Sequence, residues 1–311
     1  MWTERYRPKT LDDVKTEKSK VLLTSIQEDP TSLPHLLLYG PPGTGKTSTA
    51  LAIANQIYDK ADQPFWVKIL NASDQRGIDV VRGPVTDFCE TVGLRTTKKS
   101  YPFKLLIFDE ADAMTPDAQK DLRPKIIEHS GSVRFCFIAN YLSKMHDAIQ
   151  SRCTLIRFPP VPRHLVEAQV ARVAKGEDLA LSPDIATIIV NEAKGDLRKA
   201  THILQALESV TRLPLEDQAE EAWKTLGKPT EETIERVRVS LKGASPKDRL
   251  VIWKSNLGRF LLIDILKVYA GMIKEDFEKI PKVAEMEQRL LQEGGTCMPA
   301  HRAALMGLIV K

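Results

Sequence analysis

The sequence has few cysteines, no long uninterrupted hydrophobic run and little excess charge of either sign. Its 4 cysteines are far apart in the chain, which excludes a disulfide-bonded scaffold and a zinc site of closely spaced cysteines and predicts a reducing, intracellular environment. Apolar runs are short, and the run over residues 260–263 is ended by Asp264, so no segment approaches the roughly 18 apolar residues that a membrane span needs. The first five residues lack the apolar core of a secretory signal.

The composition that remains is that of an ordinary globular protein. The chain has 311 residues, of which 42% are hydrophobic and 28% charged, and this length suits two or three domains. The net charge of +4 permits a polyanionic partner without requiring one. Neither an internal repeat nor a low-complexity tract is evident.

The first half of the chain alternates short apolar runs with helical patterns, which is typical of a parallel sheet covered by helices. Five runs qualify as strands, namely residues 35–39, 65–70, 104–108, 134–138 and 154–158. After the prolines at 159–162 only helical spacing remains, with helix starts predicted at Ser182 and at Asp196, whose side chains suit N-caps. We therefore expect an α/β domain over residues 1–160, a small helical unit over 161–226 and a third helical block over 227–311.

A glycine-rich loop matching GxxxxGK[ST] follows the first predicted strand and precedes a helical run over residues 48–58. Such a loop turns its backbone N–H groups and the positive end of the next helix toward a triphosphate. Lys46 is expected to reach the outer phosphates and Thr47 a magnesium ion. A glycine turn without a ligand is the alternative interpretation. The predicted nucleotide-binding residues here are Gly40, Pro41, Pro42, Gly43, Thr44, Gly45, Lys46, Thr47 and Ser48.

Polar side chains also end two other predicted strands. Asp109 and Glu110 come at the carboxyl end of the third strand, the edge where open α/β sheets bind ligands. We expect Asp109 to hold Mg²⁺ and Glu110 to orient or deprotonate the attacking water. Asn140 ends the fourth strand and is a candidate contact to the γ-phosphate or the water, although an asparagine there is also an ordinary turn residue.

With these motifs the chain resembles the AAA+ ATPases, and within them the small subunits of the clamp loader called replication factor C. Four stretches carry the narrower resemblance: residues 3–11 (TERYRPKTL), 70–78 (LNASDQRGI), 150–153 (QSRC) and 195–200 (GDLRKA). The resemblance implies a P-loop AAA+ fold with a five-stranded parallel sheet, a helical lid over 161–226 and a helical collar over 227–311.

The resemblance also assigns roles that spacing alone would not. It implies that Tyr6, Arg7 and Pro8 lie near the adenine and that Arg198 reaches the γ-phosphate of its own subunit from the lid. Arg152 would be an arginine finger acting in trans on a neighbour's ATP. A guanidinium suits this role because it stabilises charge spread over phosphate oxygens. Taken alone, Arg152 and Arg198 would be ordinary surface charges.

The same resemblance points to duplex DNA as a partner through Arg76, Arg82 and Arg123, which basic patterning alone would leave as solvated charges. Two departures from the family pattern bear on this. Pro124 stands where a second arginine is usual, and we expect it to perturb the first turns of its helix. The pair Gly83-Pro84 interrupts a run that is usually helical, where Pro84 can restart a helix over 85–92. Phe88 on that helix is a clamp contact or a core residue.

The predicted function is therefore that of an ATP-hydrolysing clamp-loader subunit. ATP and Mg²⁺ are the expected ligands. Other loader subunits, in a heteropentamer, a ring-shaped sliding clamp and primer–template DNA are the expected partners, and the nucleus is the expected location. The alternatives are a nucleotide-binding structural subunit without essential turnover and another AAA+ DNA motor. Intact Lys46, Thr47, Asp109 and Glu110 argue against the structural subunit.

Overall fold

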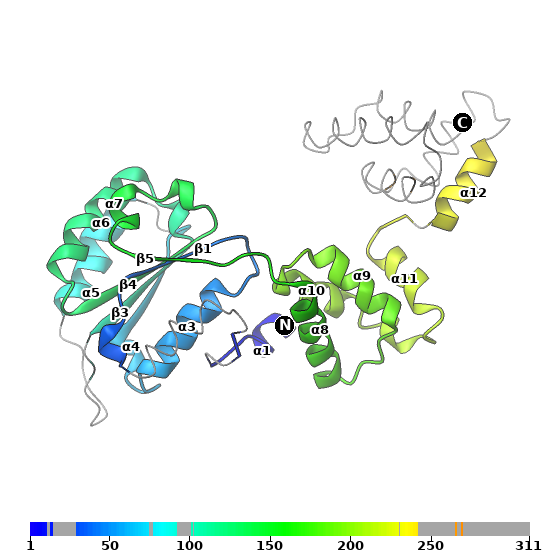
Figure 1. Cartoon of the computed structure of the whole chain (residues 1–311), viewed down its shortest axis with the longest axis horizontal. Helices are drawn as coiled ribbons and strands as arrows, with labels where there is room; N and C mark the ends of the chain where they lie inside the picture. Colours follow the sequence, from blue (N-terminus) through cyan, green and yellow to red (C-terminus); the bar gives the residue numbers. More distant parts are fainter. Residues whose placement is uncertain are drawn as a thin grey trace. The chain divides into compact units, whose positions relative to one another are not determined.

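The computed structural model describes residues 1–10, 13–14, 29–74, 77–91, 101, 103–229, 231–241, 265 and 269. The chain forms two compact units. One comprises Met1–Glu177 with Ile189–Gln205, and the other comprises Asp178–Ile188 with the chain from Ala206 onward. Figure 1 shows the sheet and its helices in the first unit. The predicted three-domain division remains a prediction, and most of its third domain lies outside the described residues.

The first unit is built on a parallel five-stranded sheet of order β2-β3-β4-β1-β5. Its strands are β1 (Leu36–Tyr39), β2 (Val67–Asn71), β3 (Lys104–Asp109), β4 (Val133–Ala139) and β5 (Thr154–Arg157). All five predicted strands and their parallel arrangement are confirmed. The second strand begins two residues later than predicted, because Phe65 and Trp66 belong to the short helix α4 (Gln63–Trp66).

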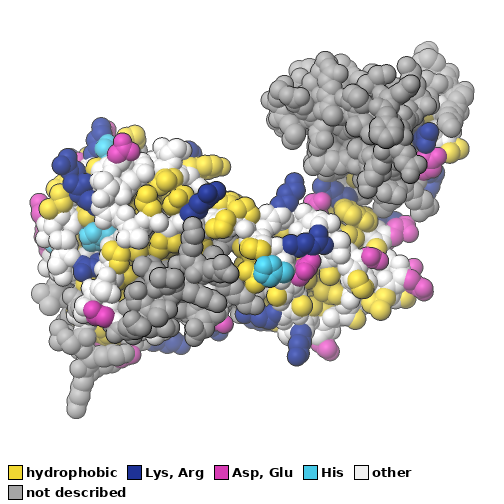
Figure 2. Space-filling model, viewed as in Figure 1, with side chains coloured by type: hydrophobic (Ala, Val, Ile, Leu, Met, Phe, Trp, Pro, Cys, Tyr) yellow, Lys and Arg dark blue, Asp and Glu magenta, His cyan; other side chains and the backbone are white. Residues whose placement is uncertain are grey.

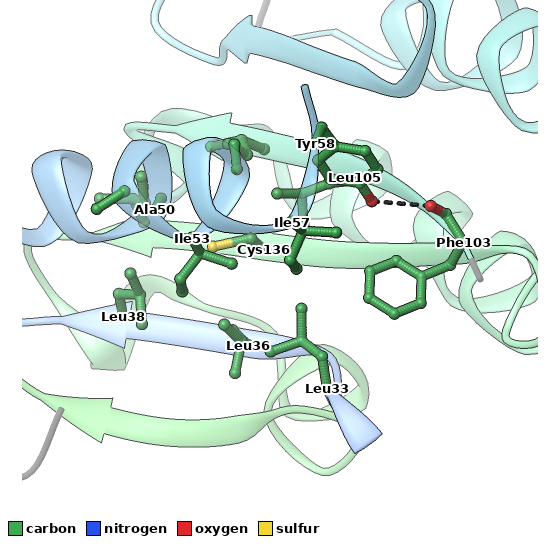
Figure 3. Packing of buried hydrophobic residues seen from close by; sticks show 14 of the residues in the cluster. Leu33, Leu36, Leu38, Ala50, Ile53, Ile57, Tyr58, Phe103, Leu105 and Cys136 are labelled. Atoms are coloured by element: carbon green, nitrogen blue, oxygen red, sulfur yellow. Dashed lines mark hydrogen bonds between the residues drawn. The ribbon is translucent and has the colours of Figure 1, made fainter. Parts of the chain in front are cut away.

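Side chains alternate between two hydrophobic layers, one on each face of the sheet, as the two-residue repeat of a strand requires. Leu36 and Leu38 of β1 face α3 (Lys46–Ile57), where Ile53 and Ile57 are buried (Figure 3). Leu37 faces the opposite layer, which contains Phe108, Phe135 and Phe137. In the first layer the Tyr58 hydroxyl donates to the Phe103 carbonyl at 2.8 Å, so this buried polar group is satisfied (Figure 3). The sheet is thus covered on both faces, as predicted.

Helices cover the sheet and make up the described chain after Pro162 (Figure 1). None of the described helices is both long and apolar enough to cross a membrane. The further helices are α1 (Trp2–Arg5), α5 (Thr86–Glu90), α6 (Pro116–Glu128), α7 (Asp147–Gln150), α8 (Arg163–Gly176), α9 (Pro183–Ala193), α10 (Leu197–Ala206), α11 (Gln218–Thr225) and α12 (Glu231–Leu241). Short turns of other helix types are η1 (Pro30–Ser32), η2 (Val81–Val85), η3 (Ala111–Ala113), η4 (Leu142–Lys144) and η5 (Val210–Arg212).

Both proline predictions were wrong in detail. Pro124 lies in the interior of α6, which begins at Pro116 behind an N-cap of Thr115, so the first turns are undisturbed. The proline side chain is on an exposed face, where solvent can satisfy the carbonyl group that loses its partner. Pro84 does not restart a helix but lies inside the π-helical turn η2, which leads directly into α5. The Thr86 hydroxyl donates to the Val81 carbonyl at 2.8 Å within this turn.

Phe88 on α5 is partly buried against the core layer that contains Phe108. The ammonium groups of Lys68 and Lys104 lie 5.9 and 4.9 Å from its ring centroid. Lys104 also donates to the carbonyls of Phe88, Cys89 and Thr91 at the end of α5, a favourable place for a cation. Packing within the domain therefore accounts for Phe88.

The predicted N-caps are confirmed in both units. Ser182 Oγ accepts from the Ile185 N–H at 3.3 Å, and Asp196 Oδ1 accepts from the Lys199 N–H at 2.8 Å. In the second unit Gln218 is fully buried and makes four hydrogen bonds. Its amide group donates to three carbonyls and its oxygen accepts from the Ser182 N–H at 3.0 Å. One side chain thus holds the chain before α9, the turn η5 and the helix α11 together.

We expect Gln218→Leu to destabilise α11 by about 3 kcal/mol, because leucine fills the space but leaves the buried backbone partners of the amide unsatisfied. Hydrogen–deuterium exchange at peptides covering α11 measures this loss. The control is Gln56→Leu, a substitution at an exposed position of α3. Unchanged protection of α11 in the Gln218 variant would contradict the assignment.

Candidate functional site

The glycine-rich loop forms a tight turn between β1 and α3. Gly40 has φ of 145°, and a Cβ there would lie 2.0 Å from the Phe158 carbonyl oxygen, so only glycine fits. Gly43 has φ of 67°, and a Cβ there would meet the Asp196 carboxylate. The Thr44 hydroxyl closes the turn by donating to the Pro41 carbonyl at 2.9 Å. The loop therefore has the compact shape that the motif predicts, with the N-terminus of α3 directly behind it.

Lys46 is buried at the centre of the loop. Its Nζ donates to the carbonyls of Gly40 at 2.7 Å and Pro41 at 2.8 Å, and to Asn140 Oδ1 at 3.0 Å. The pKa of this ammonium group is lowered to about 8, mainly by burial, while the carboxylates of Asp109 and Asp112 oppose the shift and the charge of Arg198 adds to it. From the sequence, Asn140 is either a site residue or an ordinary turn residue. In the structure its side chain is hydrogen-bonded to Lys46.

The two predicted carboxylates lie beside the loop at the end of β3. Thr47 Oγ1 donates to Asp109 Oδ2 at 3.2 Å, so two oxygen ligands of the kind that Mg²⁺ prefers converge here. Glu110 follows with φ of 54°, a left-handed conformation unusual for a glutamate, and its N–H donates to Asp109 Oδ1 at 3.0 Å. The described residues hold no group of three or more His, Cys, Asp or Glu side chains that could bind a metal without other ligands.

A cavity of about 260 Å³ opens over this loop. Its phosphate end is lined by residues 42–48, with Asp109, Glu110 and Asn140. At the other end lie Tyr6, Arg7 and Pro8 of the N-terminal segment, with Leu165 of α8. Gly40 and Pro41 do not line the cavity, but their carbonyls hold Lys46. The cavity thus joins polar groups suited to phosphates with a partly apolar end suited to a base.

The N-terminal segment is fixed to α8 at the base end of this cavity. The Tyr6 hydroxyl donates to Glu177 Oε1 at 2.8 Å, and Arg172 donates to the Tyr6 carbonyl at 2.7 Å. Gly176 allows the tyrosine to approach, because a Cβ there would lie 2.2 Å from its hydroxyl oxygen. Burial and the hydrogen bond to Glu177 raise the pKa of Tyr6, so the phenol stays neutral.

The start of α10 contacts the glycine-rich loop directly. The Leu197 N–H donates to the Gly43 carbonyl at 3.0 Å, and the Asp196 carboxylate packs against the Gly43 Cα. Arg198, the next residue, lines the cavity with an exposed side chain. The predicted contact between the second sensor and the phosphate end is therefore possible within this unit.

Arg152 does not line this cavity. Its guanidinium donates to the Ala148 carbonyl at 2.9 Å and to the Ser151 hydroxyl at 3.1 Å, beyond the end of α7. The side chain is only half-buried and pairs with no carboxylate among the described residues. This placement leaves Arg152 available to a site outside its own domain.

Two of the three candidate DNA contacts are described. Arg82 is 68% exposed and pairs with Asp121 of α6 at 3.3 Å, and Arg123 is exposed on the same helix. Arg76 lies outside the described residues. Figure 2 shows several Lys and Arg side chains over the part of the sheet unit where Figure 1 places α6 and α7.

The sequence interpretation missed several residues at or beside the site, among them Asp112, Arg172 and Gln169. Asp112 accepts from the Tyr141 N–H at 3.2 Å, Arg172 and Gln169 line the base end of the cavity, and the latter two come from a helix with no motif. A further buried residue, Gln119 of α6, accepts from the His146 N–H at 2.7 Å and donates to the Lys144 and Met114 carbonyls. Only Asp112 had a local signal, since it shares the carboxylate-rich turn with Glu110.

The lowered pKa of Lys46 predicts that nucleotide affinity falls with rising pH. Only the protonated ammonium attracts phosphates, so the dissociation constant should rise about fivefold between pH 8 and pH 9 as the group loses its proton. Titration with a fluorescent ATP analogue from pH 7 to 9.5 measures this. Lys46→Arg is the control, because a guanidinium stays charged and should give a flat profile at weaker affinity. A flat profile for the unaltered lysine would contradict the prediction.

The comparison with known families and proteins agrees with this geometry. Residues 36–161 match the family described as "ATPase family associated with various cellular activities (AAA)". The chain is 45% identical over 235 residues to replication factor C subunit 5 of Homo sapiens, covering 75% of this chain and 63% of the human protein. It is 38% identical over 324 residues to replication factor C subunit 3 of Blastobotrys adeninivorans, covering 99% and 92%. The alignment thus spans less than two thirds of the human relative's length.

Solved structures with this fold include the Thermotoga maritima RuvB Holliday junction branch migration motor. It superposes with a TM-score of 0.57 at 16% identity, covering 86% of this chain and 91% of that chain. An identity this low shows a shared fold alone.

Proposed function

Because this chain belongs to the family of replication factor C subunits, we propose that it is an ATP-hydrolysing subunit of a DNA sliding-clamp loader. The observation that carries the proposal is the convergence of Lys46, Thr47, Asp109 and Asn140 on one cavity that also has Glu110 at its edge. A subunit that only holds other subunits together does not need these catalytic and phosphate-binding side chains. The chemistry is phosphoryl transfer to water, used for conformational work.

Each side chain of the cavity has its own role in the proposed hydrolysis of ATP. Lys46 binds the outer phosphates once it exchanges its loop carbonyls for them, and Asn140 orients the γ-phosphate or the water. Glu110 accepts the proton of the attacking water. Thr47 and Asp109 would hold Mg²⁺, which supplies charge neutralisation at the phosphates. Tyr6, Arg7 and Pro8 close the base end, and Arg198 adds positive charge from α10.

Arg152 acts in trans in this proposal. Its position away from its own cavity supports the assignment, because a finger must project toward a neighbour. Each subunit then has two interfaces. At one interface its ATP site is contacted by an arginine of a neighbour, and at the other its own Arg152 contacts the ATP site of the next subunit. Hydrolysis becomes conditional on assembly, and we propose a heteropentamer held together by the helical block over residues 227–311, with the helical unit over 161–226 acting as a lid.

The proposed partners are a ring-shaped sliding clamp and primer–template DNA. ATP binding helps the assembly open the clamp and grip DNA, and hydrolysis releases the closed clamp. A nuclear location follows for a eukaryotic source from the resemblance alone, and an archaeal source would make it cytoplasmic.

Neutralising Arg76, Arg82 and Arg123 together should weaken DNA binding by the assembled complex about tenfold or more at 0.1 M salt. The reason is that each of these arginines is expected to contact a DNA phosphate. Each lost contact should also reduce the slope of log affinity against log salt concentration by about one. Titration of fluorescent primer–template DNA at several salt concentrations measures both effects. The control is Arg212→Ala, an exposed arginine of η5. Equal affinity and equal salt dependence would refute the DNA assignment.

The decisive test of the proposed function is purification of the native complex through a tag on this chain. The expected result is a complex whose native mass fits five related subunits and which loads a ring-shaped clamp onto primed circular DNA only with ATP. A homohexamer that moves branched DNA without a clamp would favour the motor alternative, whose fold is the same. Clamp loading that is unaffected when this subunit cannot hydrolyse ATP would favour a structural subunit.

A further inference from the structure

The turn after β3 carries a third carboxylate, Asp112, for which the proposed reaction has no role. It lies in η3, two residues after Glu110, and its side chain is half-buried. Its Oδ2 accepts a hydrogen bond from the backbone N–H of Tyr141 at 3.2 Å. The bond joins the turn after β3 to the segment that leaves β4, so it links the ends of two neighbouring strands.

The segment that Asp112 holds has no sheet ladder to support it. Pairing of β4 with β1 ends at Ala139, and Asn140 and Tyr141 continue beyond that point. The Tyr141 side chain does not anchor the segment either, because it is 60% exposed and contacts the Lys144 ammonium group at 5.0 Å from its ring centroid. The Tyr141 carbonyl accepts from the Lys144 N–H at 3.2 Å in the turn η4. The carboxylate therefore supplies a charge-assisted anchor for the Tyr141 N–H, between the end of β4 and this turn.

The anchored residue is the direct neighbour of Asn140. Asn140 Oδ1 accepts from Lys46 Nζ at 3.0 Å, so the amide must keep its direction toward the phosphate end of the cavity. A backbone shift at Tyr141 would move that amide first. Small displacements of an orienting group lower rates strongly, since the reacting atoms need close alignment.

Asp112 is not needed for the shape of its own turn. The N–H groups of Ala113 and Met114 donate to the carbonyls of Glu110 and Ala111, so the backbone alone closes η3. The following helix α6 has its own N-cap in Thr115. Loss of the Asp112 side chain should therefore leave the turn and the helix in place.

We propose that Asp112 is a positioning residue that fixes the backbone at Tyr141 and so aims the Asn140 amide at Lys46 and the γ-phosphate. The proposal rests on the proposed ATPase function of the same site. The main alternative is that Asp112 acts only through its charge, which lies near enough to Lys46 to favour the protonated lysine. The two roles separate in an asparagine variant, because an amide oxygen still accepts from the Tyr141 N–H but carries no charge.

The test compares Asp112→Ala and Asp112→Asn in the assembled complex, with the other ATP sites inactivated. Three quantities are measured: hydrogen–deuterium exchange of peptides covering residues 140–145, the dissociation constant of a fluorescent ATP analogue, and kcat. The matched controls are Asp117→Ala and Asp117→Asn. Asp117 is an exposed aspartate of α6, and its ion pair with Lys120 is long, at 3.7 Å.

We expect Asp112→Ala to speed exchange at residues 140–145 and to lower kcat about tenfold, with the dissociation constant within about twofold of the original. Asp112→Asn should restore slow exchange and bring kcat to within about threefold. The proposal is overturned if the alanine variant exchanges and turns over like the original, or if the asparagine variant is as impaired as the alanine variant, which would indicate a charge effect.

Failure of the underlying function would look different. If the unaltered complex, with its other ATP sites inactivated, did not hydrolyse ATP, the proposed function would be wrong. The exchange measurement would still report whether Asp112 anchors residues 140–145. A complex that hydrolyses ATP through Glu110 but ignores Asp112→Ala would refute the positioning role alone.

Discussion

Replacing Arg152 with alanine should lower ATP hydrolysis at the neighbouring subunit's site by about 10³-fold while this subunit still binds ATP. A guanidinium supplied by a neighbour stabilises charge on the phosphate oxygens in the transition state, and such fingers are worth about 10³ to 10⁵ in rate. Nucleotide binding by this subunit should not change, because Arg152 does not line its own cavity. Its present contacts, to the Ala148 carbonyl and the Ser151 hydroxyl, are to uncharged oxygens, and a phosphate is a stronger acceptor for a guanidinium.

The measurement needs a complex in which only the site facing Arg152 is active, because turnover from other subunits would hide the loss. The matched control is Arg157→Ala, which removes an exposed arginine from the adjacent strand β5. Native mass of each complex checks that assembly is unaffected. Unchanged turnover at the facing site in the Arg152 variant would sink the assignment of a finger.

The parts of the site that the sequence predicted share one property, namely that local sequence determines them. The glycine-rich loop needs residues at fixed spacing, and Gly40 and Gly43 take the conformations that only glycine adopts easily. Asp109 and Asn140 could be placed together because carboxyl ends of parallel strands share one edge, and Lys46 bonds to Asn140 at 3.0 Å as that rule implies.

The parts that the sequence did not predict depend on contacts between distant segments. No local pattern indicates that Asp112 would meet the Tyr141 N–H or that Gln119 would bond to three backbone groups at once. The error at Pro124 has the same origin. Its helix begins at Pro116 because the Thr115 side chain caps it, and burial of Leu122 and Ile126 keeps the helix intact past the proline.

Those distant contacts also change how the candidate site should be described. Lys46 is bonded to Asn140, Asn140 is adjacent to Tyr141, and Tyr141 is held by Asp112. Gln119 connects the same region to α6, the helix that carries Arg123. The phosphate end of the cavity is therefore part of a bonded network rather than a set of independent side chains, so single substitutions there should not have additive effects.

The second large effect is expected for Glu110→Gln, which should lower turnover at this subunit's own site by about 10² to 10⁴-fold and leave ATP binding intact. A positioned general base contributes about this much, and glutamine cannot accept the proton of the attacking water. The fold should tolerate the change, because glutamine has the same shape, and the backbone N–H of residue 110 still donates to Asp109 Oδ1. The left-handed φ of 54° is equally costly for both residues.

The measurement is single-turnover hydrolysis in a complex whose other sites are inactive, together with the dissociation constant of a fluorescent ATP analogue. Glu128→Gln, at an exposed position of α6, is the control for loss of one negative charge. Loss of turnover with retained binding assigns the proton transfer to Glu110, because a structural defect would weaken both. Retained turnover would instead mean that Glu110 is not the general base of this site. If the unaltered subunit showed no turnover in the same complex, the cavity would bind ATP without hydrolysing it, and the chain would be a nucleotide-dependent structural subunit.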